Sequence, residues 1–268
     1  MISAIESGQQ DSAVTHPLHG RHAVVTGAAQ GIGAAIARAL AAQGAKLTLM
    51  GRRLPLLEAL ALELTGAHAV AVDVADADAV QRAFAQARAA HGPIDILINN
   101  AGQAASAPFG KTSLALWQRM LDVNLTGTFL CTQQGLPDMQ AARRGRIVNI
   151  ASTAGQRGYA YVAAYAAAKH GVVGMTRSLA LEVAKQGITV NAVCPGYTDT
   201  EILQTSIANV VEKTGRSADH ARAEFEKSNP QGRILRVEEV AQAVLWLCSD
   251  SAGALTGQCI SVSGGEVM

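Results

Sequence analysis

From about residue 20 onward, short β-rich runs alternate with longer Ala-rich stretches of helical periodicity, and this alternation limits the possible folds more than any other feature. Such alternation is typical of βαβ units, which build a parallel sheet with helices on both faces. Several runs are apolar throughout, as a sheet covered on both sides requires. The candidate strands are His22–Thr26, Lys46–Met50, Ala67–Val72, Ile94–Asn99, Arg146–Ala151, Ile188–Cys194 and Gln258–Val262. We therefore predict a single-domain α/β fold with a doubly wound, seven-stranded parallel sheet.

The composition agrees with one folded domain. Apolar residues make up 49% of the chain and charged residues only 16%, against roughly 25% charged in ordinary soluble domains. The longest purely apolar run, Tyr159–Ala168, is shorter than the roughly 20 residues of a membrane span. Met1–His19 lacks the basic start and apolar stretch of a secretory signal. We expect a flexible leader over residues 1–20, the domain over residues 21–268, no membrane association and a cytoplasmic location.

The formal net charge is +1, and no cluster of five or six basic residues suggests a nucleic-acid surface. The cysteines and histidines show no spacing typical of metal ligands, so we expect no metal site. We interpret the cysteines as small buried hydrophobic residues. They are Cys131, Cys194, Cys248 and Cys259.

Glycines mark the ends of two expected helices, because Ile32–Gln43 stops at Gly44 and Asp76–His91 stops at Gly92. One interval breaks the alternation. The stretch of about residues 197–229 is polar, mixed in charge and too long for an ordinary connection. We predict a mobile lid there, containing some helix.

The first candidate strand runs directly into a glycine-rich turn, Thr26–Gly33, and then into a helix. This strand–turn–helix order is what a dinucleotide site requires. Without a Cβ atom, Gly27 permits a tight turn, Gly31 lets the backbone approach a pyrophosphate, and Gly33 lets the helix lie close to the strand. The helix N-terminus then faces the anion. A plain strand-to-helix connection is the alternative, but the position after the first strand favours phosphate binding.

Tyr165 and Lys169 are four residues apart, which places a phenol and an ammonium group on one face of a helix. Such a pair also arises by chance, so the surroundings matter. The preceding strand ends near Ser152, which adds a hydroxyl group. A free phenol, with a pKa of about 10, is a poor base at neutral pH. A neighbouring Lys169 cation is expected to lower that pKa.

These elements occur in a characteristic order. The glycines are spaced G-x-x-x-G-x-G, the fourth strand ends in Asn99–Gly102, and Ser152 precedes the Tyr165–Lys169 pair. On these motifs the chain resembles the short-chain dehydrogenase/reductase family. The resemblance covers residues 26–200 and a C-terminal Ser-Gly-Gly. It implies a single-domain Rossmann-type fold and a homotetramer, less often a dimer.

The resemblance also implies a catalytic tetrad of Asn124, Ser152, Tyr165 and Lys169. Tyr165 would donate or accept the proton, and Ser152 would hydrogen-bond the carbonyl oxygen as charge builds on it. Lys169 would also hold the nicotinamide ribose. Asn124 would support a water that links Lys169 to solvent; a polar residue on an exposed helix face is the alternative.

The expected cofactor is NADP(H) rather than NAD(H). Gly51 stands where an NAD-selective domain places an acid, and Arg52 offers a donor fork suited to a 2′-phosphate. Against this, Gln30 occupies a position where many NADP-preferring relatives carry a basic residue, and Arg53 is better explained as an exposed helix-start charge. Asp73 would meet the adenine or merely cap a turn. The full expected set of cofactor contacts is Gly27, Gln30, Gly31, Ile32, Gly33, Arg52, Asp73, Val74, Asn100, Ala101, Gly102, Tyr165, Lys169, Pro195, Gly196, Thr198 and Thr200.

The motif pattern looks most like the β-ketoacyl thioester reductases and 3-hydroxyacyl-CoA dehydrogenases of the family, acting on a small-molecule carbonyl or alcohol. One alternative is a dehydrogenase of a small secondary alcohol, sugar or cyclic ketone. Another is a non-catalytic NADP-binding sensor or scaffold. Five basic residues are candidates to meet an acidic carrier protein or CoA phosphates, although scattered surface charge explains each of them better. They are Arg143, Arg144, Lys213, Arg216 and Arg222.

Overall fold

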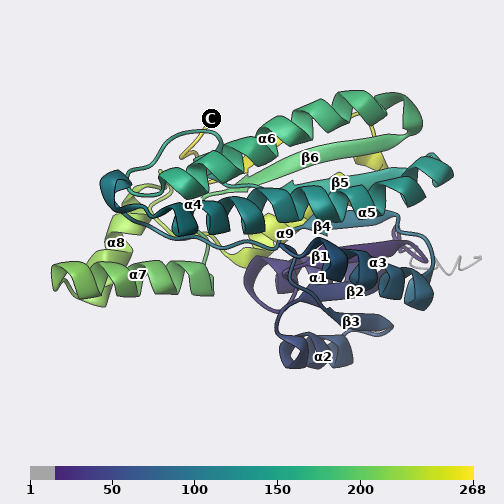
Figure 1. Cartoon of the computed structure of the whole chain (residues 1–268), viewed down its shortest axis with the longest axis horizontal. Helices are drawn as coiled ribbons and strands as arrows, with labels where there is room; N and C mark the ends of the chain where they lie inside the picture. The colour runs from purple at the N-terminus through teal and green to yellow at the C-terminus, as the bar shows by residue number, and fades with distance from the viewer. Residues whose placement is uncertain (1–15) are drawn as a thin grey trace, which may run out of the picture.

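The computed structural model describes residues 16–268, and within them the strands form one parallel sheet (Figure 1). The expected leader at residues 1–15 lies outside the described residues. The strand order is β3-β2-β1-β4-β5-β6-β7, which is the predicted doubly wound arrangement. The strands are β1 (His22–Thr26), β2 (Lys46–Gly51), β3 (Ala67–Ala71), β4 (Ile96–Asn99), β5 (Gly145–Ile150), β6 (Ile188–Pro195) and β7 (Cys259–Val262). The fold prediction is confirmed.

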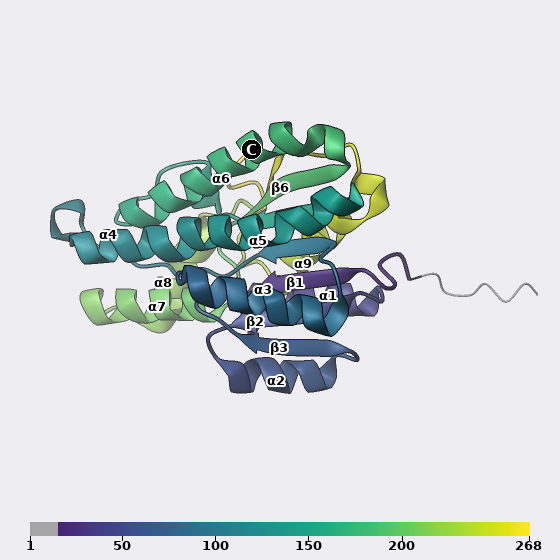
Figure 2. The ribbon, with the colours of Figure 1, turned by 45° about the vertical axis from the view of Figure 1, so that its right-hand side comes forward.

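Helices cover both faces of the sheet (Figures 1 and 2). Helices α1, α2 and α9 contribute to the core on one face, and α3, α5 and α6 to the core on the other. The helices are α1 (Gly31–Ala42), α2 (Leu54–Glu63), α3 (Ala77–His91), α4 (Leu114–Leu121), α5 (Gly127–Ala142), α6 (Ala163–Val183), α7 (Glu201–Thr214), α8 (Ala218–Lys227) and α9 (Val237–Cys248). Among the described residues, no helix combines the length and apolar character needed to cross a bilayer.

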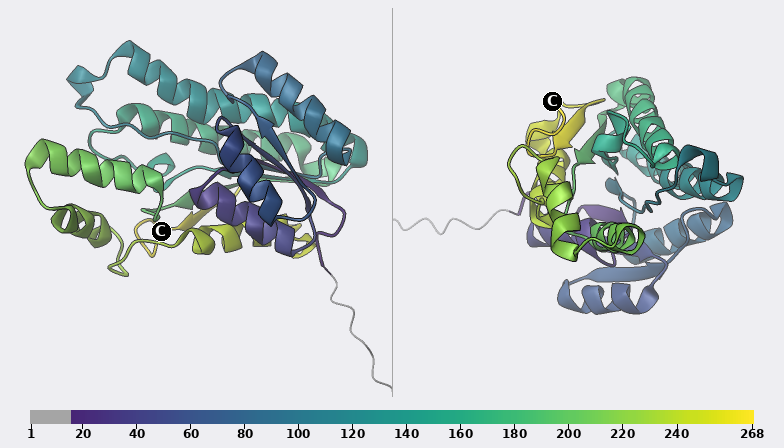
Figure 3. Two further views of the ribbon diagram at one scale, coloured as in Figure 1. Left: turned by 90° about the horizontal axis from the view of Figure 1, so that it is seen from below. Right: turned by 90° about the vertical axis from the view of Figure 1, so that its left-hand side faces the viewer.

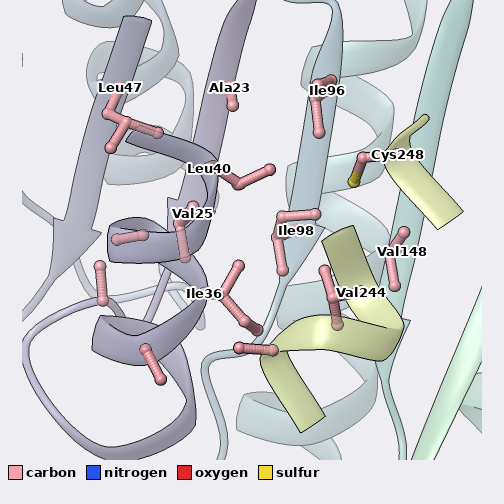
Figure 4. Close-up of a cluster of buried hydrophobic side chains, with 14 of the residues drawn as sticks. Ala23, Val25, Ile36, Leu40, Leu47, Ile96, Ile98, Val148, Val244 and Cys248 are labelled. Atoms are coloured by element: carbon pink, nitrogen blue, oxygen red, sulfur yellow. The ribbon is translucent and has the colours of Figure 1, made fainter. Parts of the chain in front are cut away.

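The core follows from the two-residue repeat of a strand. Ala23 and Val25 of β1 point to one face, where they belong to the same cluster as Ile36 and Leu40 of α1 (Figure 4). The intervening Val24 points to the other face and its separate cluster. Burial on both faces explains why β1 has no polar alternation.

The expected element ends are correct to within one or two residues. Gly44 and Gly92 adopt φ values of 82° and 81°, the left-handed region in which glycine ends helices at little cost. Strand β4 begins later than predicted. The N–H of Ile94 donates to the Asp138 carboxylate at 3.1 Å instead of entering a strand ladder.

The lid segment, residues 197–229, contains two helices, α7 and α8, which project beyond the sheet (Figure 3). The hydroxyl of Thr200 accepts a hydrogen bond from the N–H of Leu203 and caps α7. The hydroxyl of Ser217 caps α8 in the same way, and Gly215 ends α7 with a φ of 70°. The segment is therefore more regular than its polar sequence suggests.

Two expectations need correction. Leu18 is only 1% exposed and belongs to the hydrophobic core, so the packed structure begins before residue 21. Cys259 is partly exposed rather than buried, unlike the other cysteines. It lies against Cys194 of the neighbouring strand, and their side-chain hydrogen bond lowers the pKa of Cys259.

Candidate active site

A large cavity opens at the carboxyl edge of the sheet, where the strand order reverses between β1 and β4. Doubly wound sheets bind their ligands at such a reversal. The cavity volume is about 910 Å³. Every residue predicted to bind cofactor or to act on substrate lines it: Gly27, Gln30, Gly31, Ile32, Gly33, Arg52, Asp73, Val74, Asn100, Ala101, Gly102, Asn124, Ser152, Tyr165, Lys169, Pro195, Gly196, Thr198 and Thr200. Residues from eight segments of the chain thus meet in one place.

Two glycines of the turn, Gly27 and Gly33, have no room for a side chain. A Cβ atom on Gly33 would lie 2.2 Å from the carbonyl oxygen of Gly27, and one on Gly27 would lie 2.8 Å from the Cα of Ala101. Gly27 and Gly31 also adopt positive φ values of 64° and 55°. A backbone cradle of this kind, with the N-terminus of α1 behind it, fits a pyrophosphate.

Thr26 fastens this turn to the segment that follows β4. Its hydroxyl oxygen accepts hydrogen bonds of 3.0 Å from the N–H groups of both Asn100 and Ala101. The Asn100 amide donates in return to the carbonyl oxygens of Thr26 and Gly27, at 3.0 and 3.1 Å. From the sequence, Thr26 is only the first residue of the turn. Its partner is distant in sequence, so no local pattern reveals the contact.

Tyr165 and Lys169 lie one turn apart on α6, close to Ser152. The Lys169 ammonium lies 5.7 Å from the centre of the Tyr165 ring. Burial raises the pKa of Tyr165, and a hydrogen bond with the Ser152 side chain lowers it in part. Burial also lowers the pKa of Lys169 to about 8. Without a cofactor, burial therefore raises the pKa of Tyr165, whereas the sequence predicted that Lys169 would lower it.

Asn124 lies in a π-helical turn, η2 (Asp122–Thr126), between α4 and α5. It is fully buried, which excludes the exposed-face alternative. Its Oδ1 accepts from the N–H of Gln103 at 3.2 Å, and its Nδ2 donates to the carbonyl oxygens of Gln103 and Met120 at 3.0 and 2.9 Å. A Cβ on Gly102 would lie 2.9 Å from Asn124 Oδ1 and 3.7 Å from the Lys169 ammonium. Asn124 thus fixes the backbone of Gln103, which follows Gly102 next to Lys169.

Both arginines after β2 line the cavity. With the Gln103 amide oxygen turned toward Arg52, that oxygen accepts from both terminal guanidinium nitrogens, at 3.1 and 3.3 Å. Arg53 is exposed, as expected, but it also pairs with Glu201 of α7 at 3.5 Å and donates a hydrogen bond to Gln30. Gln30 in turn donates to Glu201. The start of the lid is therefore joined to the glycine-rich turn.

The structure also shows local roles for two expected contacts. The Asp73 carboxylate accepts from the N–H of Ala75 at 3.0 Å, which is the turn-capping alternative, although Asp73 also lines the cavity. The Thr200 hydroxyl donates to the carbonyl oxygen of Thr198 at 3.2 Å while it caps α7. Both residues still line the cavity despite these contacts.

Tyr159 and Tyr197 also form part of the cavity wall. The Tyr159 hydroxyl donates to the Glu266 carboxylate at 2.7 Å. Burial raises the pKa of Tyr159 to about 12, and Glu266 contributes to the shift. Glu266 is not predictable from the sequence, because nothing near it in the sequence marks a site.

The fold and this cavity define a dinucleotide-binding α/β protein. A family model described as short chain dehydrogenase matches residues 21–210. The chain therefore belongs to the short-chain dehydrogenase family. It is an oxidoreductase, as the motifs predict.

Two relatives and one solved structure illustrate the similarity. The chain is 42% identical to cis-4-hydroxycyclohexanecarboxylate dehydrogenase of Sinomonas cyclohexanicum, over 91% of this chain and 96% of the relative. It is 38% identical to 3-oxoacyl-acyl-carrier-protein reductase of Aquifex aeolicus, over 92% and 98%. It is also similar to a crystal structure of an actinorhodin polyketide ketoreductase variant with NADPH, with a TM-score of 0.89, 37% identity and coverage of 92% and 97%.

Proposed function

We propose that the protein interconverts 3-oxoacyl and 3-hydroxyacyl thioesters by hydride transfer with NADP(H). One observation carries the proposal: the side chains of Ser152, Tyr165 and Lys169 meet in the cavity that begins at the glycine-rich turn. A proton-transfer group and a dinucleotide cradle in one cavity are what a carbonyl reductase needs.

The residues present fit the cofactor. The glycine-rich turn fits a pyrophosphate, and Arg52, which lines the same cavity, supplies a guanidinium suited to a 2′-phosphate. Gly51 offers no acid that would repel this phosphate or hold a free ribose hydroxyl. These features favour NADP(H) over NAD(H). The bound dinucleotide supplies or accepts the hydride at its nicotinamide ring.

Three side chains handle the substrate oxygen and its proton. Tyr165 donates its hydroxyl proton to the carbonyl oxygen in reduction and takes it back in oxidation. Ser152 donates a hydrogen bond to the same oxygen as negative charge develops. Lys169 holds the nicotinamide ribose and stabilises the phenolate by its charge. Asn124 fixes the Gln103 backbone next to Lys169 and supports a water that links Lys169 to solvent.

Relatives support two substrate classes. The Aquifex relative is named for a carrier-protein-bound 3-oxoacyl substrate, and the structural neighbour for a polyketide. The Sinomonas relative, at 42% identity, is named for a cyclic alcohol, so a cyclic ketone or alcohol is the second candidate. A non-catalytic sensor remains the third, and the arrangement around Tyr165 argues against it.

The proposed assembly is a homotetramer. Phe129 on α5 and Leu181 on α6 are large apolar side chains that are 48% and 83% exposed. Exposed apolar side chains on neighbouring helices favour burial against further copies of the chain. Light scattering of the purified protein would give the mass of the assembly, and a monomer would contradict it.

Reduction of acetoacetyl-CoA with NADPH and with NADH, beside a panel of simple and cyclic ketones, tests the proposed function. We expect turnover of the thioester with NADPH. Turnover of a cyclic ketone but of no thioester would favour the second candidate. Binding of NADPH with no turnover of any carbonyl would favour the sensor.

A further inference from the structure

The Glu266 side chain is a buried acid beside the substrate end of the cavity, and the proposed mechanism does not use it. It is 1% exposed. Its Oε1 accepts from the Tyr159 hydroxyl at 2.7 Å and lies 3.5 Å from the guanidinium of Arg157. Its Oε2 has no hydrogen-bond partner among the described residues. A Cβ on Gly196 would lie 2.9 Å from this oxygen, so the carboxylate is wedged between Gly196 and Tyr159.

This arrangement is costly for folding. A buried carboxylate with incomplete hydrogen bonding loses hydration that its contacts do not restore. The Arg157 guanidinium does not fully offset this loss of hydration. Its side chain is 47% exposed, so water screens its attraction to the buried carboxylate. If this side chain served only to pack the C-terminal segment, an apolar residue would give a more stable protein. The position of this acid therefore points to a role in the neighbouring cavity.

The contacts of Glu266 converge on one cavity residue. Tyr159 lines the cavity, and its single hydroxyl proton is directed to Glu266. The Arg157 guanidinium lies 4.6 Å from the centre of the Tyr159 ring and also donates to the backbone carbonyl of Glu266 at 3.3 Å. The Tyr159 ring is thus held at its hydroxyl end and over its face.

A neighbouring tyrosine provides the contrast. Tyr161 also lines the cavity, but its side chain is 66% exposed and its hydroxyl makes no hydrogen bond to another described residue. Only its backbone is tied, through its carbonyl oxygen, to the N–H of Ala107 at 2.8 Å. The same short segment therefore carries one fixed and one free aromatic ring.

We propose that Glu266 is a positioning residue that fixes the Tyr159 ring as a wall of the substrate cleft. It acts through Tyr159 and touches neither the substrate nor the cofactor. The fixed ring limits how a carbonyl compound can place its two substituents when it approaches Tyr165. The inference rests on the proposed function only in that a carbonyl substrate occupies this cavity.

A double-mutant cycle on Glu266→Ala and Tyr159→Phe tests the proposal. Each single change is expected to raise KM about five-fold, the effect of losing one ordering hydrogen bond, with a smaller effect on kcat. The double variant should lie within about two-fold of the single ones, because both changes remove the same contact. Each variant should also lower the excess of one product enantiomer. Multiplied effects in the double variant would overturn the proposal.

Tyr161→Phe is the matched control. Its combination with Glu266→Ala should give the product of the two separate effects on KM, because Tyr161 does not contact Glu266. Glu266→Gln retains an oxygen that can accept from Tyr159, so it should restore KM close to the wild-type value. It removes a buried charge as well, so its melting temperature should not fall. A lower melting temperature in Glu266→Ala with an unchanged KM would mean a structural role only.

The measurements use whichever carbonyl compound of the panel is turned over, so the outcome does not depend on the thioester assignment. If no compound is turned over, the proposed function fails, and the position of the Tyr159 ring still decides this inference. A crystal structure of Glu266→Ala with NADPH should show the ring displaced from the cavity wall. A ring in its original place would overturn the proposal.

Discussion

The Lys169 ammonium donates a hydrogen bond of 2.8 Å to the carbonyl oxygen of Ile150, the last residue of β5. This contact anchors the lysine to the central sheet, one helical turn from Tyr165. The lysine is 4% exposed, so its charge acts in a poorly hydrated environment where electrostatic effects are strong.

Tyr165→Phe should lower kcat by about 10²- to 10⁴-fold, because the proton donor is lost while the ring remains. The affinity for NADPH, measured by isothermal titration, should change little. Tyr197→Phe is a control that removes a hydroxyl from the same cavity. Equal losses in the two variants would contradict the assignment of Tyr165.

The reduction should lose kcat/KM as pH rises through about 8, the value to which burial lowers the pKa of Lys169. Below that pH the ammonium is charged, and above it the charge is lost. The pKa of Tyr165 is raised by burial, so the phenol keeps its proton across this range. Lys169→Arg keeps a permanent charge, and its residual activity should show no inflection near pH 8. The pH profile of kcat/KM for both proteins is the measurement.

The two arginines after β2 should differ in their effect on cofactor choice. Arg52→Ala should weaken NADPH binding roughly 10- to 150-fold, since charge-assisted hydrogen bonds contribute roughly 1.5–3 kcal/mol, and should leave NADH binding unchanged. Arg53→Ala should weaken NADPH binding less, because the charge of Arg53 is partly neutralised by its ion pair with Glu201. Titration of both nucleotides into each variant checks this. Equal weakening of NADH would show that Arg52 does not read the 2′-phosphate.

Stability should fall in mild acid. Burial lowers the pKa of His22 and His91 below the ordinary value of 6.5. The folded state therefore favours the neutral rings, and the unfolded chain binds more protons as pH drops below 6.5. The contribution of these two rings to the free energy of unfolding is complete above pH 6.5 and is lost as pH falls toward their lowered pKa values. Urea unfolding at pH 7.5 and pH 5 should show the loss, and His22→Gln should reduce it.

Much of the fold and site was predictable because the signals are local. The glycine-rich turn, the Tyr165–Lys169 spacing and the order of the strands each depend on neighbouring residues. The ends of the lid helices could also have been predicted, since Thr200 and Ser217 are residue types that favour the N-cap and Gly215 is one that ends helices. The polar composition of the lid obscured them.

Other features depend on tertiary contacts that no local pattern contains. In the π-helical turn, the Asn124 side chain binds the backbone of Gln103, 21 residues away. Glu266 and Tyr159 are 107 residues apart. The pKa of Tyr165 depends on the balance between burial and nearby charge, and that balance requires the packed structure.

The bonds between Thr26 and Asn100 connect positions 74 residues apart, across strands β1 and β4. The nucleotide cradle therefore acquires its final shape only after the two halves of the sheet have come together. In a refolding experiment, recovery of NADPH affinity should lag behind the recovery of helix content. A dinucleotide that binds only after the two halves have joined would stabilise the joined state, and this stabilisation would increase with its concentration.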